Sequence, residues 1–170
     1  MDGKRLAFEA GSAAGAEVDD ARAEEIDRRA GMLFDRYNTR PRALPGAHDL
    51  LASLDETGVA WAIATSSRAE QVAASIAALD LSHPPRIVDG SRVAHAKPAP
   101  DLLLLAADEL RVDPHATWYV GDSAWDMRAA VAAGMVPIAV TSGAAVGASD
   151  LREAGAAVVV ETLEQLQLPD

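Results

Sequence analysis

The sequence predicts an α/β fold with a Rossmann-like parallel sheet and helices on both faces. Short, continuous apolar runs recur along the chain, as at residues 59–65 and 136–140. Such runs are typical of strands buried on both faces. Amphipathic stretches of helical length separate the runs. Regular alternation of strand and helix indicates an open α/β sheet.

The N-terminal residues 1–41 are polar, rich in alanine and helix-prone. After an acidic start, residues 19–37 carry apolar side chains at near-helical spacing, namely Ala21, Ile26, Met32, Leu33 and Tyr37. Pro41, Pro45 and Gly46 then interrupt the helical pattern. We therefore expect a domain or subdomain boundary near these residues.

From Gly46 onward, each expected element follows from a change in periodicity or from a glycine or proline. The predicted helices are 47–58, 68–79, 99–110, 124–134 and 148–155, and the predicted strands are 59–65, 86–90, 116–121, 136–140 and 156–160. Ser67 and Glu70 have the spacing of a capping box at the start of the helix at 68–79.

Composition narrows the classes of function. The chain has 170 residues, enough for one domain with a full core, and its net charge of −11 disfavours nucleic acid and anionic membranes. It has no cysteine, which excludes disulfides and thiolate metal sites. No apolar run approaches the roughly 20 residues of a membrane span. Without the apolar stretch of a signal peptide at the N-terminus, we expect a cytoplasmic protein.

Three polar stretches follow predicted strands, where open α/β sheets bind ligands. Thr65 and Ser66 end the first strand, and their hydroxyl and backbone N–H groups would suit an anion. Lys97 precedes the helix at 99–110, against the helix dipole. Asp122 and Asp126 follow the strand at 116–121, and carboxylate oxygens are the ligands that Mg²⁺ takes.

Each of these residues also has a purely structural interpretation. Ser66 or Ser67 would cap a helix, and Lys97 would be a solvated lysine before a turn. Ser123 and Asp126 fit the S-x-x-D capping box. A further set of polar side chains is expected on loops or on the surface, although its arginines could approach a substrate anion: His83, His95, Arg40, Arg42 and Arg68.

The order of these motifs resembles the haloacid dehalogenase-like hydrolase superfamily, especially its helical-capped phosphatases and mutases. The resemblance rests on an apolar strand ending in Thr65, the stretch Lys97-Pro98-x-Pro100-Asp101, and Gly121-Asp122-Ser123-x-x-Asp126. It runs from about Leu44 to the C-terminus. It implies that residues 1–43 are a partial helical cap and residues 44–170 the Rossmann-like phosphatase core.

The resemblance also implies roles for the residues. Thr65 and Ser66 would hold the substrate phosphate, Lys97 would pair with the phosphate and the nucleophile, and Asp122 and Asp126 would hold Mg²⁺. The implied activity is Mg²⁺-dependent hydrolysis of a small phosphorylated metabolite, of sugar-phosphate or phosphoglycolate type, through an aspartyl-phosphate. Positioning and charge neutralisation account for most of such catalysis. Oligomeric state is not readable from the sequence.

The family's first motif, D-x-D-G-[T/V], is missing. Met1-Asp2-Gly3 is a poor match, because no apolar strand precedes it and Lys4 follows it. We therefore expect a truncated chain whose core lacks the first strand and the nucleophile, and which has little activity as it stands. Two other classes remain open: a non-catalytic regulatory relative that binds phosphate and metal, and an unrelated Rossmann-like binding domain.

Overall fold

The computed structural model describes residues 3–168, without the side chains of residues 4, 5, 9 and 35. The chain divides into two compact units, Met1–Pro41 and Arg42–Asp170. The division falls in the proline-containing stretch where the sequence predicts a boundary. The assignment of residues 1–43 as a partial cap stays a prediction, and Asp2 lies outside the described residues.

The first unit consists of two helices, α1 (Gly3–Ala13) and α2 (Asp20–Tyr37), which pack against each other. Small side chains at their contact, Ala7 and Ala23, are buried and allow the backbones to approach. Asp19 caps α2 by accepting a hydrogen bond of 2.7 Å from the backbone N–H of Arg22. The helix expected at residues 19–37 is thus present almost to the residue.

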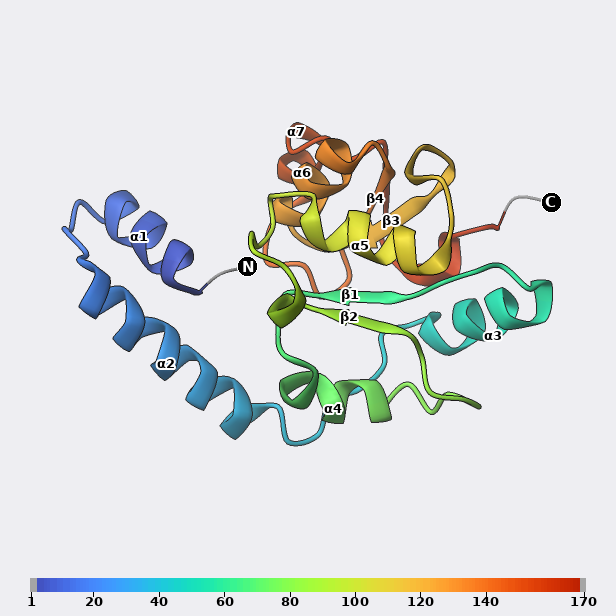
Figure 1. Ribbon diagram of the computed structural model, residues 1–170, viewed down its shortest axis with the longest axis horizontal. Coiled ribbons are helices and arrows are strands. Elements are labelled where there is room, and N and C mark those ends of the chain that lie inside the picture. Colours follow the sequence, from blue (N-terminus) through green and yellow to red (C-terminus); the bar gives the residue numbers. More distant parts are fainter. Residues whose placement is uncertain (1–2, 169–170) are drawn as a thin grey trace. The chain divides into compact units, whose positions relative to one another are not determined.

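The second unit alternates helices and strands, as Figure 1 shows. Its helices are α3 (Ala47–Thr57), α4 (Ala69–Ala77), α5 (Asp101–Leu110), α6 (Ala124–Ala133) and α7 (Ala148–Glu153). Its strands are β1 (Ile63–Thr65), β2 (Ile87–Asp89), β3 (Trp118–Gly121), β4 (Val136–Val140) and β5 (Val158–Val160). Three short 3-10 turns complete it: η1 (Gly90–Arg92), η2 (Pro114–Ala116) and η3 (Leu163–Gln165). The α/β class and the parallel pairing are confirmed.

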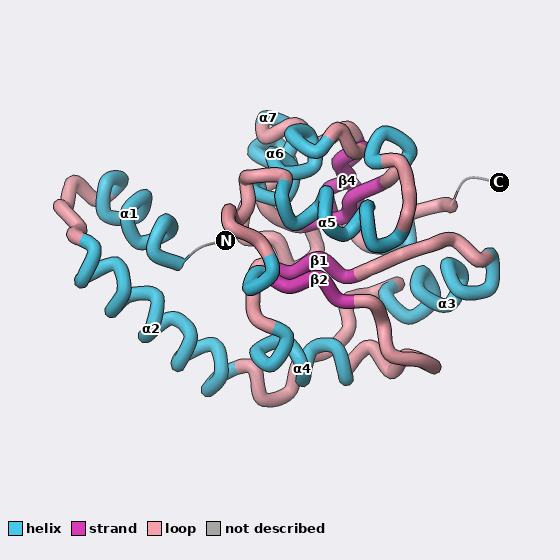
Figure 2. The backbone as a smooth tube through the Cα atoms, in the orientation of Figure 1, coloured by secondary structure: helices cyan, strands magenta, loops and turns pink. Residues whose placement is uncertain are grey.

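The strands form two parallel sheets, shown in magenta in Figure 2. In one sheet β1 pairs with β2, and Ala64 lies opposite Val88. In the other the order is β3-β4-β5, and Val120 lies opposite Ile138. Among residues 3–168, no strand joins β1 to β3. The polar ends of both strands are nevertheless brought together by the helices described next.

Helices α5 and α6 hold the two sheets in one unit. Leu102 and Leu103 of α5 are each 1% exposed, and they share a core cluster with Val88 of β2 and with Met135, which directly precedes β4. Helix α5 contacts β1 and β2, whereas α6 contacts β3 and β4. Burial of these apolar side chains is the main force that keeps the strand ends near each other.

Two local predictions are wrong. The apolar run at 59–65 forms a strand only from Ile63, because β2 is three residues long and offers no longer partner. The capping box expected between Ser67 and Glu70 is absent. Helix α4 begins one residue later, and the backbone N–H of Arg68 donates to the side chain of Gln71 at 3.1 Å.

Within the described residues no helix combines the length and the apolar character that crossing a bilayer requires.

Candidate active site

Lys97 is the centre of the candidate site and lies in the loop before α5. It is 6% exposed, so its ammonium group depends on protein partners rather than on water. Its Nζ donates to Oδ1 of Asp126 at 2.8 Å and to the backbone carbonyl of Ala64 in β1 at 3.3 Å. It also donates to the phenol oxygen of Tyr119 in β3. One lysine therefore links the two sheets at their carboxyl ends.

Asp126 is held in place from both of its oxygens. Oδ1 accepts from Lys97 and, at 3.0 Å, from the hydroxyl of Tyr119. Oδ2 accepts from the hydroxyl of Ser123 at 2.7 Å and from its backbone N–H at 3.2 Å. The N–H of Asp126 in turn donates to the Ser123 hydroxyl at 3.2 Å. The S-x-x-D capping box is thus present at the start of α6, and the same carboxylate also pairs with Lys97.

The ion pair determines the charge of Asp126. Burial opposes its ionisation, but the charge of Lys97 and the hydrogen bonds from Lys97, Ser123 and Tyr119 outweigh burial, so the pKa of Asp126 lies below its usual value. Burial, followed by the charge of Asp126, raises the pKa of Tyr119 well above its ordinary value. The phenol therefore stays protonated and remains a hydrogen-bond donor.

Gly121 makes this packing possible. A Cβ atom built on Gly121 would lie 2.7 Å from Cβ and 2.8 Å from Cγ of Asp126, closer than real side chains approach. The missing side chain at the end of β3 is what lets Asp126 fold back over the strand toward Lys97 and Tyr119.

At the end of β1, Thr65 and Ser66 differ in their bonding. The hydroxyl of Thr65 accepts from the backbone N–H of Ser67 at 3.2 Å, which shapes the turn into α4. The hydroxyl of Ser66 is buried and has no hydrogen-bond partner in the part of the chain that the structure describes. An unpaired buried hydroxyl is costly, and a ligand that supplied an acceptor would remove the cost.

Asp122 differs from Asp126 in being exposed and in making no hydrogen bond to the Lys97 cluster within residues 3–168. Partial burial of its carboxyl group, followed by the charge of Asp126, raises its pKa, and Lys97 opposes this only weakly. A bound cation would oppose both effects, because it would stabilise the ionised Asp122 carboxylate.

The carboxylates of this site partly fit a hard divalent cation. Lys97, Asp122 and Asp126 carry one positive and two negative charges, a net charge of −1 that favours a cation and opposes a bare phosphate. Asp122 has oxygens available, whereas those of Asp126 already accept four hydrogen bonds. No cluster of three or more potential metal-ligating side chains occurs among the described residues. Magnesium sites commonly complete their coordination with water and substrate phosphate.

Sequence reasoning missed Tyr119 and the acid partners of the two histidines. Tyr119 lies inside an apolar run, and only its hydroxyl, two residues before the strand end, distinguishes it from a core residue. His83 and His95 are exposed as expected, but His83 lies 3.0 Å from Asp55 and His95 lies 2.8 Å from Asp101. Because His95 and Asp101 are close in the sequence, their spacing could have predicted this contact.

The chain is similar in sequence to known hydrolases. The family model for haloacid dehalogenase-like hydrolases matches residues 17–140. Phosphoglycolate phosphatase of Escherichia coli strain K12 is 34% identical over 131 residues, which cover 74% of this chain and 52% of that protein. The chain thus spans about half the length of the curated relatives it matches.

Solved structures show the same similarity. A hydrolase from Pseudomonas syringae superposes with a TM-score of 0.87 at 30% identity, over 96% of this chain and 74% of that one. A haloacid dehalogenase family hydrolase from Deinococcus radiodurans R1, with bound phosphate and sodium, has a TM-score of 0.67 at 26% identity over 94% and 70% of the two chains.

Proposed function

The chain belongs to the haloacid dehalogenase-like hydrolase family, and we propose on that premise that the ends of β1 and β3 bind a phosphate monoester together with Mg²⁺. The reaction served is hydrolysis of a small phosphorylated metabolite, of sugar-phosphate or phosphoglycolate type. The observation that carries the proposal is the buried Lys97, held by Asp126, Tyr119 and the Ala64 carbonyl where the two strands end. A cytoplasmic location stays a prediction.

The phosphate is proposed to lie between the turn after β1 and the ammonium of Lys97. Ser66 supplies a buried hydroxyl that has no partner within residues 3–168, and Thr65 orders the turn through the N–H of Ser67. Lys97 supplies a positive charge whose position is fixed by three acceptors. The phosphate found in the Deinococcus relative supports an anion site in this fold.

The metal is proposed to bind at Asp122, with Asp126 as the second acidic residue. Asp122 is proposed as the direct ligand because it is exposed and makes no hydrogen bond to the Lys97 cluster within residues 3–168. Asp126 anchors Lys97 and adds negative charge on the same side. When bound, Mg²⁺ neutralises phosphate charge and activates the phosphorus toward attack. Thr65, Ser66 and Lys97 orient the phosphate oxygens.

Turnover through an aspartyl-phosphate needs a carboxylate that attacks phosphorus while the alcohol leaves with a proton, and water then cleaves the acyl phosphate. No D-x-D-G motif occurs in residues 1–170. We therefore propose that these residues bind phosphate and Mg²⁺ but turn over little substrate without an attacking carboxylate supplied by a D-x-D-G-T segment.

Calorimetry tests the binding site. Titration of the 170-residue chain with inorganic phosphate should give heat only when Mg²⁺ is present, and Asp122→Asn should weaken Mg²⁺ binding by at least about tenfold. Asp108→Asn, which removes an exposed carboxylate in α5, is the control and should bind normally. Phosphate binding of equal strength with and without Mg²⁺ would contradict the proposed metal role.

Activity tests the chemistry. The 170-residue chain should leave p-nitrophenyl phosphate intact, and a robust rate would show that the account of the attacking carboxylate is wrong. If DNA upstream of the Met1 codon encodes an in-frame D-x-D-G-T, the extended protein should hydrolyse this substrate with Mg²⁺. Binding without turnover in the extended protein would favour the regulatory alternative.

A further inference from the structure

The chain segment that follows β2 lies against the segment that follows β1. We call residues 65–67, at the end of β1, the β1 turn, and residues 89–91, at the end of β2, the β2 turn. Figure 1 shows the two strands side by side, and Thr65 lies opposite Asp89 at the end of their parallel pairing. One residue further on, the backbone N–H of Gly90 donates to the carbonyl of Ser67 at 3.4 Å. The two turns are therefore neighbours, and the position of one depends on the other.

Gly90 of the β2 turn lies directly against the backbone of Ser66. A Cβ atom built on Gly90 would lie 3.0 Å from the carbonyl carbon and 3.3 Å from the Cα of Ser66, and closer still to the carbonyl oxygen. All three are backbone atoms, so no rotation about a side-chain bond could make room. The φ angle of Gly90 is not positive, so its backbone conformation does not itself require glycine. The close approach of Ser66 is what excludes a larger residue.

The β2 turn is anchored at its start. Val88, which precedes it, is 0% exposed. The carboxylate of Asp89 accepts from the backbone N–H of Ser91 at 2.8 Å and from the Ser91 hydroxyl at 2.5 Å, which closes an Asx turn around Gly90. The hydroxyl of Ser66, in contrast, has no hydrogen-bond partner within residues 3–168. We therefore expect that a methyl group added at Gly90 would displace Ser66 rather than the β2 turn.

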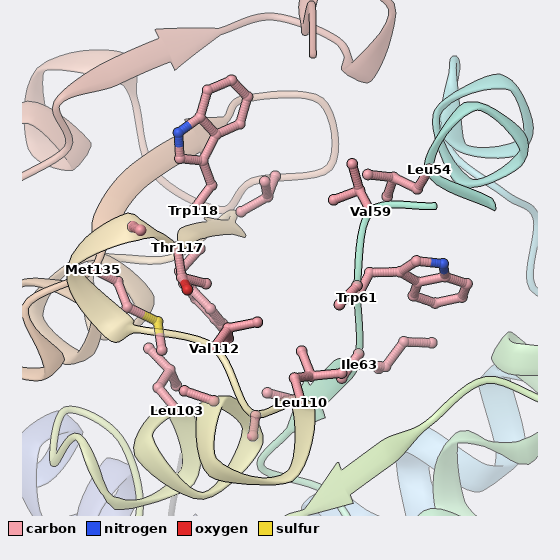
Figure 3. A pocket seen from close by; sticks show the side chains of 18 of the residues that line it. Leu54, Val59, Trp61, Ile63, Leu103, Leu110, Val112, Thr117, Trp118 and Met135 are labelled. Atoms are coloured by element: carbon pink, nitrogen blue, oxygen red, sulfur yellow. The ribbon is translucent and has the colours of Figure 1, made fainter. Parts of the chain in front are cut away.

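The contact between Gly90 and Ser66 does not involve the apolar pocket beside β1, which has a volume of about 510 Å³. In Figure 3 the labelled Trp61 and Ile63 form part of the wall of this pocket. Neither Ser66 nor Gly90 lines it. A substitution at Gly90 should therefore act on Ser66 and not on the packing around the pocket.

We propose that Gly90 is a positioning residue of the candidate site: it lets the β2 turn support the backbone of Ser66, and so fixes where the Ser66 hydroxyl meets a bound phosphate. The role rests on the proposed function, because phosphate is the ligand that this hydroxyl serves. Gly90 itself has no side chain and does not need to touch the ligand. Since Asp122 follows β3 and not β1 or β2, Gly90 should affect phosphate binding and leave Mg²⁺ binding unchanged.

Calorimetric titration of the 170-residue chain with inorganic phosphate, at saturating Mg²⁺, tests the role of Gly90. Gly90→Ala should weaken phosphate binding by at least about tenfold, because the hydroxyl loses its alignment with a charged ligand. Titration with Mg²⁺ alone should give the affinity of the unchanged protein. Gly147→Ala is the matched control, since a Cβ atom at that glycine would make ordinary contacts, 3.6 Å to Asp150 and 3.8 Å to Ser149. It should bind both ligands normally.

A double-mutant cycle separates positioning from a merely structural role. Ser66→Ala removes the hydroxyl and should weaken phosphate binding by a factor similar to that of Gly90→Ala. The double variant should bind phosphate about as weakly as either single variant, because both changes act through the same hydroxyl. If Gly90 served packing alone, its effect on phosphate affinity would instead be independent of the residue at position 66.

Asp89 supplies a second pair of variants, which decides the outcome if Gly90→Ala does not fold. Asp89→Asn and Asp89→Ala both remove the negative charge, but only asparagine keeps a side-chain oxygen that accepts from the N–H of Ser91. The β2 turn should therefore keep its shape in Asp89→Asn and loosen in Asp89→Ala. Phosphate should bind Asp89→Asn more tightly than Asp89→Ala by about threefold or more.

Several results would overturn the role of Gly90 while the proposed function stands. They are equal phosphate affinity of Gly90→Ala and the unchanged protein, additive losses in the cycle with Ser66→Ala, and a loss of Mg²⁺ affinity as large as the loss of phosphate affinity. Equal phosphate affinity of the two Asp89 variants would have the same meaning. If the unchanged protein binds no phosphate in the presence of Mg²⁺, the proposed function is wrong and the role of Gly90 fails with it. The unchanged protein alone thus tells the two failures apart.

Discussion

Strands β1 and β4 have similar apolar sequences but very different surroundings. β4 pairs on both sides, and Ile138 in it is 2% exposed. β1 pairs only with β2 among the described residues, and none of its three residues is fully buried. The difference shows that two neighbours in the sheet, more than apolar composition, bury a strand.

The candidate site draws on both kinds of strand. Thr65 ends the partly paired β1 and Ser66 follows it, whereas Asp122 and Asp126 follow β3, which belongs to the better covered sheet. Lys97 and the core under α5 connect the two halves. The geometry of the site therefore depends on a few contacts, each of which can be removed separately.

Removal of the buried ion pair between Lys97 and Asp126 should have the largest effect on the free energy of unfolding. Lys97→Met leaves the Asp126 carboxylate buried without its cation, which should lower the free energy of unfolding by about 3–5 kcal/mol. The double variant Lys97→Met with Asp126→Leu should lose less, since no charge is left unpaired. Urea denaturation of the three proteins measures both. Equal losses in the single and double variants would argue against a coupled pair.

Truncation of matched isoleucines compares the two strands directly. Ile138→Ala in β4 should cost roughly 3 kcal/mol, because a buried side chain leaves a cavity. Ile63→Ala in β1 should cost roughly 1 kcal/mol, since that side chain is only partly buried. Thermal and urea unfolding give both values. A larger loss at Ile63 would contradict the weaker burial of β1.

Tyr119→Phe should lower the free energy of unfolding moderately. The variant keeps the ring but loses the hydroxyl that bonds to Lys97 and Asp126, which should cost about 1 kcal/mol. Tyr37→Phe, at a side chain that is 74% exposed, serves as the control and should be neutral. If the two variants unfold at the same urea concentration, the phenol does not help to hold the lysine.

The surface ion pairs of Glu109 should contribute least to the free energy of unfolding. Glu109 of α5 pairs with Arg92 and lies 3.4 Å from Arg86. The hydrogen bond from Arg92 lowers the pKa of Glu109, yet these groups are in contact with solvent, where salt screens their charges. Glu109→Gln should shift the unfolding midpoint slightly at low salt and not at high salt. A shift that persists at high salt would indicate a contribution from packing.

The sequence predicted the elements well, because strand and helix periodicities are local. It also placed Thr65 and Asp122 at strand ends and Lys97 just before a helix, since turns, prolines and glycines mark those boundaries. It could not predict that Trp61 precedes β1 instead of lying within it, because strand length depends on β2, a distant segment. The contact of Tyr119 with Lys97 likewise joins residues far apart in the chain.

Whether Asp126 caps a helix or serves the site could not be decided from its spacing to Ser123. The structure shows that one carboxylate caps α6 and pairs with Lys97 at once, because its two oxygens face different partners. The roles of Thr65, Ser66, Asp122 and Asp126 toward a ligand stay predictions, since their chemistry depends on groups that a single chain does not contain.

The close approach at Gly121 also limits how this protein can evolve. Every single-nucleotide change that alters the residue encoded by a glycine codon introduces a side chain, and the first carbon of that side chain would meet Asp126. Every such substitution is therefore expected to destabilise the protein, so position 121 cannot change through a series of small, nearly neutral substitutions. In a saturation library selected for folding, position 121 should retain glycine more strictly than Ala139, its neighbour in the ladder.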